Sequence, residues 1–216
     1  MDTAAMTGQV TPEASFGPIE WSIAARPLPG QDTSGDSAVA FEIDGCAALF
    51  GVIDGLGHGP DAALAAQRAA EVIGHHPADP LDELITACHH ELAATRGAAI
   101  TLVRIGFEQH DLQWVGVGNV TATLVRRATS GMQSTSFVPL ANGIVGFQLP
   151  RIPTPGVVQM RPGHVLVMAS DGVTEDHVED LDFAASADAI ANRIIREHTR
   201  VTDDALVLVA RRRGAA

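Results

Sequence analysis

The first quarter of the chain shows the alternation of apolar and polar residues that is typical of half-buried strands. Residues 21–25 alternate in this way, and residues 39–43 do so again just before Asp44-Gly45. The stretch after that dipeptide, 46–53, is apolar throughout. An Asp-Gly between two such runs favours a two-residue hairpin turn. We therefore expect the second run to be a central strand that pairs with the first.

Two helices are predicted directly after this hairpin, and a third near the end of the chain. Apolar residues recur at helical spacing over 61–73, after Pro60, which suits the first turn of a helix. A second helix is predicted over 81–95, closed by Gly97, and a third over 186–198.

The remaining apolar runs predict strands. They span 98–105, 111–117, 120–127, 164–170 and 205–210, with weaker signals around Phe137 and Val157. Because the first two helices are inserted together and do not alternate with strands, the order favours an α+β sandwich of mostly antiparallel sheets over a doubly wound parallel sheet. We expect one domain over residues 19–210, a flexible lead-in over 1–18 and a solvated C-terminal tail over 211–216.

Composition is ordinary for a globular domain and excludes several classes of protein. Of the 216 residues, 46% are hydrophobic and 19% are charged. The net charge is −12, and an acidic chain repels nucleic-acid phosphates. Residues 1–15 contain acids but no cations, unlike a secretory signal, and no apolar run reaches the roughly 18 residues that span a bilayer. We therefore expect a cytoplasmic protein with no nucleic-acid or membrane partner.

The two cysteines, Cys46 and Cys88, are too few for a disulfide framework or a zinc site. Each lies in an apolar pattern, so we expect both to be buried as small hydrophobic residues.

Aspartates lie at the ends of the most apolar runs. Asp54 and Asp171 each follow such a run, and Asp203-Asp204 precedes the last one. The predicted turn sets Asp36 opposite Ile53, one residue from Asp54, and a slip of one residue stays open. In either register the hairpin brings two carboxylates to one end of the sheet. Clustered buried carboxylates are costly unless cations bind them, and Mg²⁺ or Mn²⁺ prefers oxygen ligands. Each Asp-Gly by itself is more typical of a turn, so the residues leave two interpretations open: a set of turns or a metal-dependent hydrolase.

Four segments, in this order and at this spacing, resemble the motif series of the PPM-type metal-dependent Ser/Thr protein phosphatases. They are SGD at 34–36, IDGLGHG at 53–59, ASDG at 169–172 and TDDALVLVA at 202–210. GVGNV at 116–120 and the run RPGHVLVMASDG are most similar to the bacterial SpoIIE/RsbX branch. The resemblance covers about residues 20–210. It implies a four-layer α-β-β-α sandwich with a binuclear Mn²⁺ or Mg²⁺ centre at one end, where water is activated for attack on phosphorus.

The same resemblance implies a role for each site residue. Asp54 would bridge both metals and the Gly55 carbonyl would bind one of them, while Asp171 and Asp203 would bind the second and Asp36 would complete the site. Asp204 is the alternative if the alignment shifts by one, and we prefer it as a supporting residue.

Two features depart from the family pattern. Larger relatives carry an N-terminal Arg that grips the phosphate, and Arg26 is the candidate here by position alone. In those relatives a His follows the first Asp-Gly, where this chain has Leu56 and places His58 two residues later. His58 is therefore our candidate general acid, with a surface turn residue as the alternative.

The resemblance implies a phosphatase that acts on phosphoserine or phosphothreonine of a STAS-domain (anti-anti-sigma type) protein, in a partner-switching or stressosome pathway that controls a stress response or a sigma factor. Two alternatives stay open: a catalytically silent phosphoprotein-binding module of the same fold, and a phosphatase for small metabolites. We expect any regulatory switch to involve the helix over 61–73.

Overall fold

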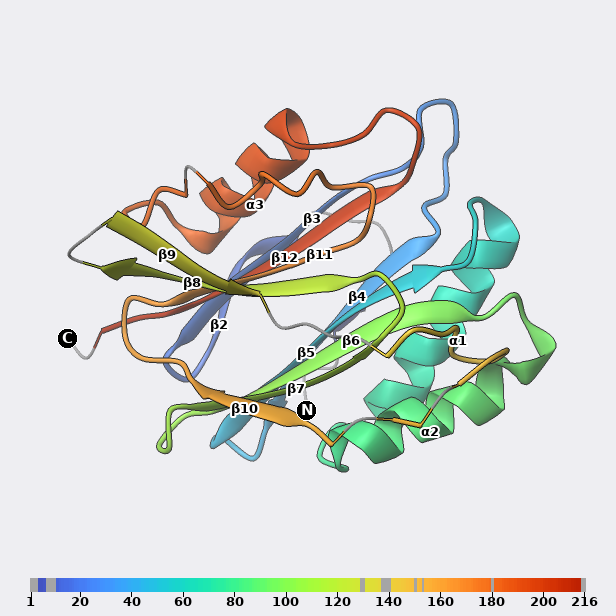
Figure 1. Cartoon of the computed structure of the whole chain (residues 1–216), viewed down its shortest axis with the longest axis horizontal. Helices are drawn as coiled ribbons and strands as arrows, with labels where there is room; N and C mark the ends of the chain where they lie inside the picture. The colour runs from blue at the N-terminus through green and yellow to red at the C-terminus, as the bar shows by residue number, and fades with distance from the viewer. Residues whose placement is uncertain are drawn as a thin grey trace.

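A computed structural model describes residues 4–6, 11–128, 131–136, 141–149, 151–152, 154–179 and 181–214. These residues form two antiparallel sheets packed face to face, with helices on both outer faces (Figure 1). The described chain is therefore an α-β-β-α sandwich of mixed α+β class, as the sequence predicted.

The first sheet has the strand order β1-β4-β5-β6-β7-β10. Its strands are β1 (Ala4–Met6), β4 (Asp36–Ile43), β5 (Ala47–Gly55), β6 (Ala98–Gly106), β7 (Asp111–Val117) and β10 (Gly156–Gln159). The strand after the predicted hairpin, β5, lies between β4 and β6, which explains why both of its faces are apolar.

The second sheet has the order β2-β3-β12-β11-β8-β9. Its strands are β2 (Thr11–Phe16), β3 (Ile19–Arg26), β12 (Ala205–Arg212), β11 (Val165–Ala169), β8 (Thr121–Ala128) and β9 (Gly131–Ser136). The weaker strand signal at Val157 is confirmed by β10, whereas Phe137 lies outside the described residues.

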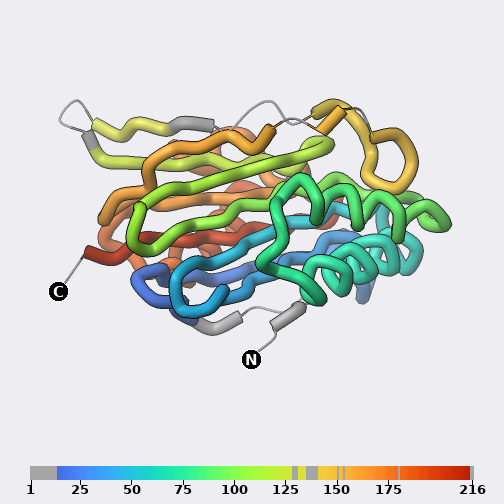
Figure 2. Tube along the Cα trace, turned by 90° about the horizontal axis from the view of Figure 1, so that it is seen from below, coloured from blue at the N-terminus to red at the C-terminus, as the bar shows by residue number. Residues whose placement is uncertain are grey.

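Among the described residues, three α-helices cover the two outer faces. α1 (Pro60–His75) and α2 (Leu81–Glu91), which continues into the short 3-10 turn η1 (Leu92–Ala94), pack on the first sheet (Figure 2). The buried face of α1 consists of alanines and Ile73, which lets the helix lie close to the sheet. α3 (Ala187–Glu197) packs on the second sheet and begins at Ser186, whose side chain accepts a hydrogen bond from the Ala189 amide.

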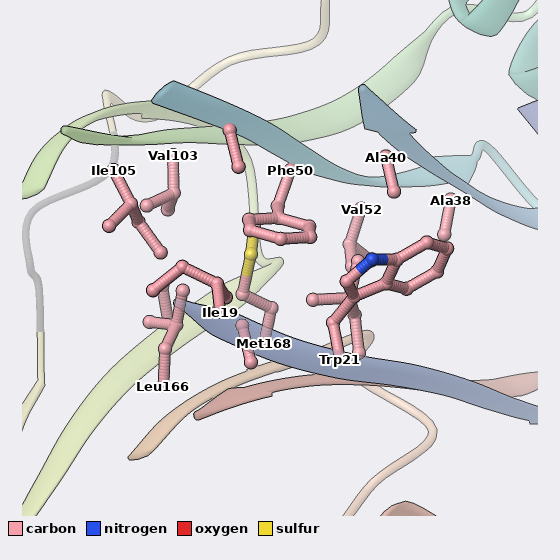
Figure 3. Close-up of a cluster of buried hydrophobic side chains, with 14 of the residues drawn as sticks. Ile19, Trp21, Ala38, Ala40, Phe50, Val52, Val103, Ile105, Leu166 and Met168 are labelled. Atoms are coloured by element: carbon pink, nitrogen blue, oxygen red, sulfur yellow. The ribbon is translucent and has the colours of Figure 1, made fainter. Parts of the chain in front are cut away.

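The core between the sheets is mainly aliphatic, with aromatic rings near its centre (Figure 3). Trp21 of β3 is 2% exposed and meets Phe50 of β5 at a ring separation of 6.0 Å. Trp114 packs against the same core from its edge. Both tryptophans therefore serve packing, which fits their place on alternating strands.

The predicted register of the first hairpin is wrong by one residue. The turn contains three residues, 44–46, and Asp44 and Gly45 both have positive φ, so Asp36 pairs directly with Asp54 and not with Ile53. Cys46 consequently lies in the turn and is exposed, contrary to expectation, whereas Cys88 is buried as predicted.

Described residues near both ends of the chain belong to strands. Residues 4–6 pair with β4 at the edge of the first sheet, and residues 11–16 pair with β3 at the edge of the second. At the other end β12 runs on to Arg212, which is 4% exposed and donates hydrogen bonds to the carbonyls of Gly106 and Phe107. Arg213 pairs with Glu20 at 2.9 Å. The expected solvated tail is thus wrong for Arg212, whereas the Arg213 side chain is 51% exposed.

Within the described ranges, none of the helices combines the length and the apolar character that crossing a membrane requires.

Candidate metal centre

The sandwich brings the predicted aspartates together at one end. Asp36 begins β4 and faces Asp54 near the end of β5, in the first sheet. In the second sheet Asp171 follows β11 and Asp203 precedes β12, and these two strands are antiparallel neighbours. Because the start of one antiparallel strand lies beside the end of the next, Asp171 and Asp203 lie at the same end of the second sheet. The Asp36–Asp54 pair lies at the corresponding end of the first sheet.

A hydrogen bond joins the two sheets at this end. The Ser170 hydroxyl donates to Asp36 Oδ2 at 2.7 Å and accepts from the Leu206 amide at 2.9 Å. Ser170 and Asp36 are 2% and 3% exposed, so the link is shielded from water. Sequence reasoning gave Ser170 no role, although it lies inside the ASDG segment.

Asp203 and Asp204 have different surroundings. Both carboxylate oxygens of Asp204 accept backbone amides, from Leu28 at 2.7 Å and from Gly35 at 2.8 Å, and the residue is 3% exposed. Asp204 therefore fixes the loop before β4. Asp203 instead lines the open cleft, which supports it as the candidate ligand of the pair.

A cleft of about 460 Å³ opens at this end of the sandwich. Asp54, Asp171 and Asp203 line it, together with His58 and Asn119. Asp36 is not among the lining residues and lies behind Asp54. Across the described residues, no three His, Cys, Asp or Glu side chains stand close enough together to hold a metal ion as they are placed.

Burial and mutual repulsion keep protons on this cluster. Burial, followed by the charge of Asp36 and then of Asp171, raises the pKa of Asp54 to about 9. Burial also raises the pKa of Asp36 to about 7, although its hydrogen bond from Ser170 acts in the opposite direction. The pKa of Asp171 is raised by burial and by Asp203, and lowered by Arg200 and Asn119. The charged forms thus need a counter-charge that the cluster itself lacks.

The donor set fits a hard divalent cation. The cleft offers carboxylate oxygens from both sheets, and a divalent ion would remove the repulsion that raises these pKa values. None of the described lining residues carries sulfur, and His58 contributes the imidazole among them.

The glycines after Asp54 and Asp171 are required by close packing. A Cβ on Gly55 would lie 2.1 Å from the carbonyl oxygen of Ala62 in α1, and a Cβ on Gly172 would lie 1.8 Å from the carbonyl oxygen of Asp204. Each glycine therefore lets a neighbouring backbone approach the residue that precedes it.

Two residues that sequence reasoning missed adjoin Asp171. Asn119 donates a hydrogen bond from Nδ2 to Asp171 Oδ2 at 2.6 Å, which fixes the orientation of that carboxylate. Arg200 is the cation whose charge lowers the pKa of Asp171, and its amide donates to the Gly172 carbonyl at 2.8 Å. The GVGNV segment was a usable signal for Asn119, whereas Arg200 lies in an irregular loop without a pattern.

The two departures from the family pattern have different outcomes. His58 is exposed at the cleft, and its Nδ1 lies 2.8 Å from Gln31 Nε2. Arg26 does not line the cleft, and its guanidinium donates to the Arg200 carbonyl at 2.6 Å. Arg26 therefore binds the loop that carries Arg200.

Comparison with known proteins identifies the family. The profile of stage II sporulation protein E (SpoIIE) matches residues 44–213. Phosphoserine phosphatase RsbX of Bacillus subtilis (strain 168) is 29% identical over 111 residues, which are 51% of this chain and 53% of RsbX. The alignment thus spans about half the length of that relative.

Two solved structures share the fold over most of their length. One comes from work on the bacterial stressosome as a modular system adapted to control secondary messenger signalling. It has a TM-score of 0.79 at 28% identity and covers 89% of this chain and 99% of its own. The other is RsbX in complex with magnesium, with a TM-score of 0.76 at 20% identity, covering 96% and 98% of the two chains. The chain therefore belongs to the SpoIIE family and has the fold of the PPM-type phosphatases, in the branch that includes RsbX.

Proposed function

We propose that this chain is a metal-dependent protein serine/threonine phosphatase. The observation that carries the proposal is that Asp54, Asp171 and Asp203 line one open cleft from two sheets, with Asp36 buried beside Asp54, in a member of the SpoIIE family. Family membership alone would also fit an inactive relative, and the intact set of four carboxylates favours the enzyme.

The same residues are our proposed metal ligands. Asp54 would bridge two ions, the Gly55 carbonyl would bind one of them, Asp171 and Asp203 would hold the other, and Asp36 would complete the set. Mn²⁺ or Mg²⁺ bound there would supply an activated water and neutralise phosphate charge. The RsbX structure with magnesium supports a divalent cation in this fold.

The protein's own side chains would position this centre and move one proton. Asn119 orients Asp171, and Ser170 orients Asp36. We propose that His58 protonates the oxygen of the departing serine or threonine. Its Nδ1 lies 2.8 Å from Gln31 Nε2, so Nε2 is the ring nitrogen that would face the leaving group.

We propose a phosphorylated STAS-domain protein of a partner-switching or stressosome pathway as the substrate. RsbX is a phosphoserine phosphatase by name, and the 28% identical structure belongs to stressosome work. Apolar side chains exposed at the cleft support a protein substrate over a small metabolite: Leu56 lines the cleft and is 47% exposed, and Val201 beside the lining residue Thr202 is 75% exposed. Dephosphorylation would then regulate a stress or sigma-factor response.

The test is Mn²⁺-dependent hydrolysis of p-nitrophenyl phosphate and of a phosphoserine STAS-domain protein by the purified chain. Asp54→Asn keeps the side-chain shape but removes the bridging charge, so we expect turnover to fall at least about 10²-fold. The control is Asp79→Asn at an exposed aspartate in the loop between α1 and α2, which should hydrolyse both substrates like wild type. Asp54→Asn activity within twofold of wild type would contradict the proposed centre. An inactive wild-type chain that still binds the phosphoprotein would favour the silent binding module.

A further inference from the structure

A second cleft, of about 520 Å³, lies at the opposite end of the sandwich. Thr121 at the start of β8 pairs with Ala169, two residues before Asp171, so Arg126 near the end of β8 lies far from the aspartates. The cleft opens between the β8–β9 hairpin of one sheet and β10 of the other, two edges that diverge at the left of Figure 1. Its floor is apolar, with the buried Leu124 and the half-buried Val158.

The walls of this cleft are cationic, in a protein that is strongly acidic. The chain has 14 cationic residues, all arginine, against 26 acids, yet Arg126, Arg127 and Arg161 line this one cleft and no described acid does. Arg127 also lies over the Phe183 ring at 5.3 Å. Within the described chain, neither Arg126 nor Arg161 forms an ion pair with a carboxylate.

Arg161 begins a turn that hydrogen bonds hold in place. The Arg161 amide donates to His164 Nδ1 at 3.3 Å, and the His164 amide donates back to the Arg161 carbonyl at 3.0 Å. The Arg212 amide then donates to the His164 carbonyl at 3.0 Å, which ties the turn to β12. Burial and the charges of Arg126 and Arg161 lower the pKa of His164, so both guanidinium groups repel the protonated form of this imidazole. An anion between them would relieve this repulsion.

We propose that this cleft binds a small organic phosphate ester, in which phosphate groups pair with Arg126 and Arg161 and an apolar or ring-bearing body covers Leu124 and Val158. The volume lies within the range of roughly 300–1,000 Å³ that is usual for small-molecule sites. Gln133 lies directly opposite Arg126 in the β8–β9 pair, and Gln159 lies on the far wall, so amide donors and acceptors flank both parts of the ligand.

Calorimetric titration of the metal-free protein with ADP, adenosine and pyrophosphate tests this site, since phosphate then has no metal to bind at the aspartate cleft. We expect ADP to bind, adenosine not to bind, and pyrophosphate to bind more weakly than ADP because it leaves the apolar floor uncovered. The affinity for ADP should fall as salt is added. Arg126→Gln and Arg161→Gln should each weaken ADP binding about tenfold, the effect of losing a hydrogen bond to a charged group.

The matched control is Arg68→Gln, which makes the same change in charge on α1, on the outer face of the first sheet. All three variants should keep the wild-type melting temperature and the wild-type rate on p-nitrophenyl phosphate. Absence of ADP binding, an equal loss in Arg68→Gln, or equally tight binding of pyrophosphate and ADP would each overturn the proposal. Failure of the proposed phosphatase activity would leave these binding results unchanged.

Discussion

At the scale of single residues, the aspartates of the site differ from surface aspartates in their burial and in their neighbouring charges. Asp54 and Asp36 have raised pKa values because burial and neighbouring carboxylates disfavour their charged forms. Asp204, the residue directly after Asp203, instead accepts hydrogen bonds from two backbone amides. The sequence shows these aspartates as equals, since only tertiary structure decides which of them receives backbone donors.

The raised pKa values predict how the stability of the metal-free protein depends on pH. Each carboxyl binds its proton more tightly in the folded state than at its usual pKa of 3.8, so stability falls as the pH rises from about 4 through about 7 for Asp36 and about 9 for Asp54. The slope is at most about 1.4 kcal/mol per pH unit for each group. Urea unfolding between pH 5 and pH 9 measures it, and Asp54→Asn should flatten the decline above pH 7. Parallel profiles for wild type and Asp54→Asn would contradict this account.

His58 is the residue whose chemical role is most sharply testable. As general acid it should matter for phosphoserine, whose alkoxide leaves poorly, and little for p-nitrophenyl phosphate, whose leaving group needs no proton. We expect His58→Ala to lose roughly 10²–10⁴-fold on the phosphoserine protein and to keep most of its rate on the aryl ester. His76→Ala, at an exposed histidine on the C-terminal side of α1, is the control. Equal large losses on both substrates would point to a disturbed turn at 55–59.

At the scale of elements, the site depends on how closely α1 approaches the end of β5. The carbonyl of Ala62 lies where a Cβ on Gly55 would be, so the helix can reach its place only because residue 55 is glycine. This is also where we proposed that a switch would act, and that expectation stays a prediction.

Gly55→Ala should push α1 away from the sheet, because the obstructing atoms belong to backbone and not to a flexible side chain. We expect a loss of stability of about 1–3 kcal/mol, as in other overpacked sites, and weaker Mn²⁺ binding. Chemical unfolding and metal titration measure the two effects. Gly214→Ala, where the added methyl group meets open space, should change neither. A Gly55→Ala protein with wild-type metal affinity would show that the position of α1 does not control metal binding at the site.

Elements were predicted well where periodicity was long and poorly where a turn or a chain end decided the outcome. The helices over 61–73, 81–95 and 186–198 correspond to α1, α2 with η1, and α3. The register of the β4–β5 hairpin was missed, because Asp44-Gly45 is compatible with turns of two or three residues and only pairing across the sheet selects one. Arg212 was taken for a solvated tail, because its buried partners are carbonyls from a strand far away in the sequence.

At the scale of the whole molecule, the proposed metals would bind a site that exists only in the folded chain. Mn²⁺ should therefore raise stability by about 2.7 kcal/mol at about 100 times its Kd. Thermal melts at increasing Mn²⁺ measure the gain, and Asp54→Asn should show little of it. A midpoint that does not move with Mn²⁺ would contradict a site formed by folding.

The four carboxylates come in pairs from two separate sheets, joined at this end by the Ser170–Asp36 hydrogen bond. The distance between the two pairs of carboxylates consequently depends on how the sheets are aligned. Side chains packed between the sheets, such as Phe50 and Met168, set that alignment. A substitution there that lets one sheet slide by a fraction of an ångström would leave every strand intact and still spoil the ligand geometry. We therefore expect repacking mutations in the middle of the sandwich to weaken metal binding before they unfold the protein.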